Sequence, residues 1–92
     1  MKKTNRISAS ITLSTEEARV LQHISESGED DIIGVSRSLR MSRQRVASLL
    51  THLKHKGLVR IKTAYGDWWV QTSRKGSQLV RSMWPELQMS YN

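Results

Sequence analysis

The stretch Ser42-Arg-Gln-Arg-Val-Ala-Ser-Leu-Leu-Thr-His-Leu-Lys-His-Lys-Gly57 decides the fold of this chain. Its apolar residues have the spacing of one face of an α-helix, at Val46, Leu49, Leu50 and Leu53. The opposite face is polar and carries Gln44, Ser48, Thr51, His52 and His55. Ser42 is suited to be the N-cap, and Gly57 can adopt the left-handed conformation that ends a helix. The stretch therefore predicts an amphipathic helix with one face for a core and one for a polar partner.

The residues before this helix predict two more helices. Ser14-Thr-Glu-Glu17 has the pattern of a capping box, in which the Ser14 hydroxyl and the Glu17 carboxylate each satisfy a free backbone N–H. The helix that follows would bury Val20, Leu21 and Ile24. We expect a second, shorter helix over 33–39 and a tight turn at 40–41. This is the spacing of a helix-turn-helix unit.

The residues after Gly57 predict a β-hairpin and a closing helix. In 58–64, apolar Val59 and Ile61 alternate with basic Arg60 and Lys62. Tyr65-Gly-Asp67 supplies turn residues, and 68–72 is rich in residues that favour strands. Ser73 is a further N-cap candidate, for a helix that Pro85 limits.

Three shorter features complete the pattern. Residues 7–13 alternate too, and either add an edge strand or lie extended over the core. Ile32 is expected to form a very short strand against the hairpin. Trp68 and Trp69 must point to opposite faces of the hairpin, and Trp68 shares its face with Val70. We therefore expect Trp68 in the core and Trp69 exposed, where it would stack on nucleic acid or pack against a partner chain or the last helix.

These elements predict an α+β fold that is mainly α-helical. It is a winged helix-turn-helix with a three-helix core, a two- or three-stranded β-wing and a C-terminal helix. A length of 92 residues suits one domain. We place that domain at 13–84, after a flexible or extended arm at 1–12 and before a tail at 85–92 that can join a dimer interface.

The charge of the chain is unevenly distributed. There are 15 Lys and Arg against eight Asp and Glu, and residues 32–92 hold all but four of the bases and only two of the acids. Such a concentrated field favours a polyanion as partner. The chain has no cysteine, which removes disulfides and thiolate metal sites, and no apolar run suits a membrane span or signal peptide. We expect a cytoplasmic protein with no membrane partner.

Three segments resemble MarR-type regulators. SRQRVASLLTHLKHKGLVRI at 42–61 is similar to their recognition helix and first wing strand, whose pattern is a Ser, a Val four residues on, spaced leucines and Gly-Leu-Val. TSRKG at 72–76 resembles their post-wing Leu-Thr-x-x-Gly, and STEEARVL at 14–21 resembles their first core helix. The resemblance covers about residues 13–84 and implies a winged-helix regulator that binds DNA.

Two departures limit what this resemblance implies. MarR-type proteins are usually longer, with flanking helices that dimerise and frame a small-molecule pocket, and this chain has little sequence beyond Met83. Their wing often ends in Asp-x-Arg, whereas Asp67 is followed here by Trp68 and Trp69. The resemblance therefore does not extend to a small-molecule effector or to an arginine at the wing tip.

The candidate DNA-contacting residues form two groups. A helix about 10–12 Å across fits a major groove about 12 Å wide, where Arg pairs with guanine and Gln with adenine. The candidates for reading bases are Arg43, Gln44, Arg45, Ser48 and His52. The candidates for contacting the DNA backbone, which position a protein without reading sequence, are Arg37, Arg40, Ser42, Lys54, Arg60, Lys62 and Tyr65.

Other sites receive less support from the sequence. His52 and His55 alone are too few for a metal site, and no cofactor motif, carboxylate pair or nucleophile-base arrangement indicates an enzyme. Apolar residues near the C-terminus exceed what a lone terminal helix needs, so we expect a homodimer formed through Met83, Trp84 and Leu87.

The predicted function is sequence-specific binding of double-stranded DNA by a small transcriptional regulator that acts by site occupancy. One alternative is a winged helix used for protein contact through Trp69 and the C-terminal apolar residues. A second alternative is binding of RNA or single strands through Trp69 and Tyr65.

Overall fold

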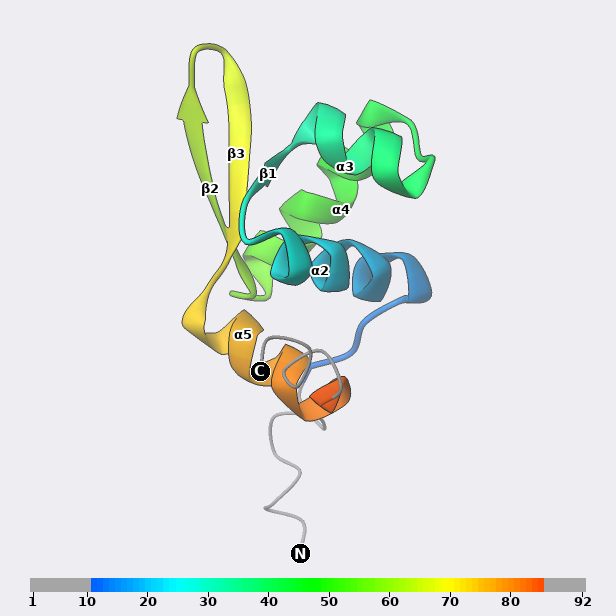
Figure 1. The fold of residues 1–92 in the computed structure, drawn as a ribbon, viewed down its shortest axis with the longest axis vertical. Helices are drawn as coiled ribbons and strands as arrows, with labels where there is room; N and C mark the ends of the chain where they lie inside the picture. Colours follow the sequence, from blue (N-terminus) through cyan, green and yellow to red (C-terminus); the bar gives the residue numbers. More distant parts are fainter. Residues whose placement is uncertain (1–10, 86–92) are drawn as a thin grey trace, which may run out of the picture.

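The computed structural model describes residues 11–85 of the 92-residue chain. Along this part, the elements are α2 (Thr15–Ser27), β1 (Asp30–Asp31), α3 (Ile32–Leu39), α4 (Arg43–His55), β2 (Val59–Ala64), β3 (Asp67–Thr72) and α5 (Arg74–Met83). Helix α2 contacts α3, α4 and α5, and the β2–β3 hairpin projects beyond the helices as a wing (Figure 1). The predicted winged helix-turn-helix is confirmed. No helix in 11–85 is long and apolar enough to cross a membrane.

Three serine caps begin the longer helices, as the sequence predicts. Ser14 accepts a hydrogen bond from the Glu17 N–H at 3.1 Å, and the Glu17 carboxylate accepts one from the Ser14 N–H at 2.9 Å, which completes the capping box. Ser42 and Ser73 each accept a hydrogen bond at 3.0 Å from the N–H three residues on. Gly57, with a φ of 78°, follows α4 in the left-handed region.

One hydrophobic core joins the helices to the sheet. Its buried members are Val20, Leu21, Ile24, Val35, Val46, Leu49, Leu50, Leu53, Leu58, Val59, Val70, Leu79 and Val80. Helix α5 lies directly on the connection between α4 and β2, and a Cβ at Gly76 would clash with the Leu58 carbonyl oxygen. The segment 11–14 forms no strand, and Ile11 and Leu13 pack against the core. Of the two expectations for 7–13, the described part fits the extended one, and 7–10 lie outside the described residues.

The sheet has three antiparallel strands in the order β1-β3-β2. The turn between β2 and β3 consists of Tyr65 and Gly66. Their φ angles are positive, at 56° and 78°, which lets a two-residue turn match the twist of the two strands. The prediction of a strand at Ile32 was wrong, because the strand is Asp30–Asp31 and Ile32 begins α3. The Asp31 carboxylate caps α3 by accepting from the Gly34 N–H at 2.7 Å, which fixes the helix start at Ile32.

The two tryptophans of the wing lie on opposite faces, as expected. Trp68 is partly buried and packs against the core. Trp69 was expected to be exposed, and it is also partly buried. Its strand is the central one, so Asp31 on β1 and Lys62 on β2 are its direct cross-strand neighbours. Side chains directly opposite each other on one sheet face lie close enough to cover one another.

Candidate nucleic-acid interface

Helix α4 has one buried stripe, formed by Val46, Leu49, Leu50 and Leu53. Its polar residues occupy the other three sides of the helix. At 100° per residue, Gln44, Ser48, Thr51 and His55 lie opposite that stripe. Arg45 and His52 lie on the flank toward α2, and Arg43 and Lys54 lie on the other flank. All of these polar side chains are exposed.

On the flank toward α2, the basic side chains of α4 are paired with carboxylates. Both Nε and Nη2 of Arg45 donate to Oε1 of Glu16, with Nε at 2.9 Å. Nδ1 of His52 lies 3.6 Å from Oε2 of Glu17. The structure thus brings two of the predicted base-reading residues to the first turn of α2.

Glu17 is the centre of this contact between α2 and α4. Its side chain is only 8% exposed, and its Oε1 accepts a hydrogen bond from the Lys56 ammonium at 2.8 Å. The same ammonium donates to the Thr12 carbonyl at 2.5 Å. Burial by itself raises the pKa of the Glu17 carboxyl, whereas the hydrogen bonds from Lys56 and the Ser14 N–H lower it. With the added charges of Lys56 and His52, the pKa lies below its ordinary value of 4.5.

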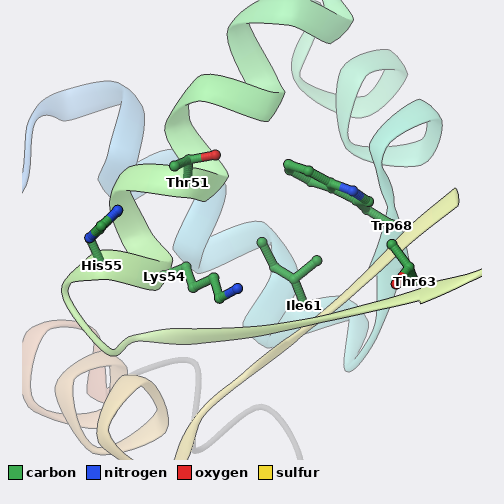
Figure 2. A pocket seen from close by; sticks show the side chains of 6 residues that line it. All are labelled: Thr51, Lys54, His55, Ile61, Thr63 and Trp68. Carbon is green, nitrogen blue, oxygen red and sulfur yellow. The ribbon is translucent and has the colours of Figure 1, made fainter.

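The other side of α4 faces the wing across an open groove. The groove has a volume of about 550 Å³ and is lined by Thr51, Lys54, His55, Ile61, Thr63 and Trp68. Figure 2 shows Lys54 and Thr51 of α4 facing Ile61 and Trp68 of the wing, with His55 at the end far from Trp68. The Thr51 hydroxyl donates to the Ala47 carbonyl at 2.9 Å. This groove combines an apolar floor with a basic edge.

The predicted backbone-contacting residues are placed at the ends and edges of this region. Arg37 and Arg40 are exposed at the end of α3, where Arg40 adopts a left-handed conformation with a φ of 57°. Arg60 and Lys62 are exposed on β2, and Tyr65 is fully exposed at the wing tip. Ser42 is exposed and serves as the N-cap of α4. Within 11–85, no ion pair involves the candidate cations Arg37, Arg40, Arg43, Lys54, Arg60 and Lys62.

Five lining residues of the groove were not among the predicted contacts: Thr51, His55, Ile61, Thr63 and Trp68. A signal for the first two was present, because both belong to the polar face of the helix by period alone. Thr63 shares a sheet face with Ile61 and is the cross-strand partner of Trp68, which the alternation of β2 also indicates. What the sequence did not show is that these two faces meet.

The predicted dimer residues are divided among different environments. Met83 is 43% exposed, and Trp84 is partly buried against the core. Leu87 lies outside the described residues. Met83 and Leu79 of α5 line a hollow of about 380 Å³ together with Ile11, Leu13 and Ala18. This is an apolar surface on the part of the molecule away from the wing.

Ligand sets for metals were not expected. Within 11–85 there is no group of three or more His, Cys, Asp or Glu side chains that could hold an ion. His23 instead pairs with Asp30, with Nε2 2.7 Å from Oδ2.

No protein-family model and no curated protein sequence matches this chain. Solved structures do match its fold. FabT of Streptococcus pneumoniae, in complex with DNA, superposes with a TM-score of 0.71 at 17% identity, over 86% of this chain and 57% of its own. BpsR of Bordetella bronchiseptica gives a TM-score of 0.74 at 20% identity, over 86% of this chain and 60% of its own.

A third match is described as a MarR family protein from Bacillus stearothermophilus. Its TM-score is 0.75 at 15% identity, and the match covers 95% of this chain and 62% of that one. The chain therefore spans about three-fifths of the length of these three proteins. Its fold is the winged helix-turn-helix of MarR-type regulators.

Proposed function

We propose that this protein binds double-stranded DNA and acts as a transcriptional regulator by occupying its site. The observation that carries the proposal is the distribution of paired and unpaired basic side chains around α4. Toward α2, Arg45, His52 and Lys56 are paired with carboxylates. Toward α3 and the wing, the six candidate cations take part in no ion pair within 11–85. Unpaired cations on one side of a helix-turn-helix are what a polyanion requires.

In this proposal, α4 enters the major groove with its first turn foremost. Arg43, Gln44 and Ser48 read base edges, because they are exposed and form no side-chain hydrogen bond within the described part of the chain. Each good bidentate pair contributes about 1–3 kcal/mol of discrimination. Arg45 and His52 are not assigned to base reading in this proposal, because they are paired with Glu16 and Glu17 of α2.

The remaining cations contact phosphates on either side of the groove. Arg37 and Arg40 lie before α4, Lys54 lies at its end, and Arg60 and Lys62 with Tyr65 lie on the wing. If each of these five cations neutralises one phosphate, log K falls with log salt at a slope of about −4.5.

The neighbouring structures support this proposal. FabT was crystallised with DNA, and DNA binding by BpsR is regulated by 6-hydroxynicotinic acid.

We also propose a homodimer that uses the apolar surface around Met83. Met83 is exposed beside the hollow formed by α5 and the start of α2. A twofold dimer would favour an inverted repeat with half-sites about 34–36 Å apart. Sedimentation of the full chain and of Met83→Glu tests this, because a charge at the interface should convert the dimer to monomer.

The salt dependence of duplex binding tests the main proposal. Fluorescence anisotropy with a random-sequence duplex pool should give a steep negative slope, and selection from the pool should enrich a motif. Competition with single-stranded DNA should leave the duplex complex intact. An absence of duplex binding at low salt would contradict the proposal, and preference for the single strand would favour a different nucleic acid.

A further inference from the structure

We propose that the groove between α4 and the wing holds the sugar-phosphate backbone of one DNA strand. In this arrangement, Lys54 and Thr63 bind a phosphate, and Ile61 and Trp68 contact the adjoining deoxyribose. The inference rests on the proposed function, because a strand passes between the two elements only if α4 lies in a major groove. It assigns a role to Trp68 and Thr63, which the base-reading helix does not use.

The shape of the groove fits an elongated polymer. It is open, has a volume of about 550 Å³, and is bounded on one side by α4 and on the other by β2 and β3. The strand that borders a major groove separates it from the neighbouring minor groove. Figure 2 shows Thr51 and Trp68 on opposite walls of the groove. With α4 in the major groove and the wing on the flanking backbone, the strand would pass through the space between them.

The donors in the groove match a phosphate. Phosphate oxygens only accept hydrogen bonds, so the site needs donors that are not already used. The Thr51 hydroxyl donates to the Ala47 carbonyl. The Lys54 ammonium and the Thr63 hydroxyl have no hydrogen-bond partner within 11–85, and both side chains are exposed. These two groups, one on each wall, are the available ligands.

The floor of the groove matches a sugar better than a free ion. Ile61 and Trp68 are partly buried apolar side chains that pack against the core, so their positions are fixed by folding. A free phosphate in contact with them would lose hydration without compensation. A deoxyribose has carbon-bound surface that can cover them, and burying apolar surface is favourable.

Matched charge variants test the phosphate ligands in the full chain. Lys54→Gln and Arg81→Gln each remove one exposed positive charge. Lys54 lines the groove, whereas Arg81 lies in the last turn of α5 and serves as the control. Lys54→Gln should make the salt slope shallower by about 0.9 and weaken binding about fivefold at physiological salt. Arg81→Gln should leave the slope unchanged. Thr63→Val should weaken binding about fivefold without changing the slope, because it removes a neutral donor.

Fluorescence of Trp68 tests the sugar contact. In the variant with Trp69→Phe and Trp84→Phe, Trp68 is the remaining tryptophan. Its emission should change on titration with duplex DNA and stay unchanged with thymidine monophosphate. A response to the monophosphate without a response to the duplex would mean that the groove takes a free nucleotide, and would overturn the strand assignment.

The outcomes separate this inference from the proposed function. If the wild-type chain does not bind duplex DNA, both fail. If it binds, but Lys54→Gln behaves as Arg81→Gln does and Trp68 emission is unchanged, the groove assignment fails while the DNA-binding proposal stands.

Discussion

The two flanks of α4 are alike in sequence and different in structure. Toward α2, Arg45, His52 and Lys56 are all paired with Glu16 or Glu17. Toward the wing, Arg43 and Lys54 have no ion-pair partner in the described part of the chain. The difference teaches that the charge of a residue in a helix-turn-helix does not by itself assign it to DNA. A cation held by a carboxylate of its own chain is first of all part of the fold.

The largest expected effect concerns base reading by the first turn of α4. Arg43→Ala with Gln44→Ala should weaken binding to the selected site by about 2–6 kcal/mol, because two base contacts are lost. Binding to unrelated duplex should weaken much less. Gel shifts on both duplexes measure this. Equal losses on both would show that the first turn of α4 contacts only the backbone.

The next effect concerns stability on the flank toward α2. Glu17→Gln and Glu16→Gln make the same change at adjacent positions, one 8% and one 40% exposed. Glu17→Gln should lower the free energy of unfolding by about 2 kcal/mol, since it removes the charge partner of Lys56 in a buried contact. Glu16→Gln should cost less than about 1 kcal/mol.

Urea unfolding of the two variants at neutral pH measures this difference. If Glu16→Gln costs as much as Glu17→Gln, burial does not distinguish the two pairs, and the description of Glu17 as the centre of the contact is wrong.

Acid should gradually remove the stabilisation that the Glu17 carboxylate contributes to the fold. The pKa of Glu17 is lower in the folded protein than its ordinary value of 4.5, so the contribution is fully present above that value. It is lost as the pH falls through the folded-state pKa, because the carboxyl must then be protonated. The stability gap between wild type and Glu17→Gln should therefore shrink as the pH is lowered below 4.5. A gap that is constant with pH would contradict this.

The smallest effect on stability is expected at the exposed pair of Arg45 and Glu16. Arg45→Ala should change the free energy of unfolding by less than about 1 kcal/mol, because both side chains are screened by solvent. It should also weaken DNA binding less than Arg43→Ala does. If Arg45→Ala instead abolishes the sequence preference, Arg45 leaves Glu16 to read a base, and the distinction between the flanks applies only to the free protein.

The local features of the fold could be predicted from the sequence. The Ser14 capping box, the caps at Ser42 and Ser73 and the turn at Gly66 each depend on residues within about four positions of one another. Their chemistry is complete within the segment that carries it. The order of elements then follows, because the spacing of a helix-turn-helix before a hairpin leaves few arrangements.

The site could be predicted only in part, because its decisive contacts join distant residues. Arg45 is 29 positions from Glu16, and Lys56 is 39 from Glu17. Periodicity places each side chain on a face but does not show which faces meet. The strand at Asp30–Asp31 also depends on contacts between residues that are distant in the sequence. Aspartate does not favour strands, and these two residues are held by pairing with Val70 and Trp69.

Strand β1 is only two residues long, yet it ties the wing to the connection between α2 and α3. Trp68 also packs against the core. The orientation of the hairpin is therefore set by folding and does not depend on a binding partner. Ordering a free segment on association costs about 1–2 kcal/mol per residue in conformational entropy. A wing set by folding avoids that loss, so its contacts can contribute to affinity almost undiminished.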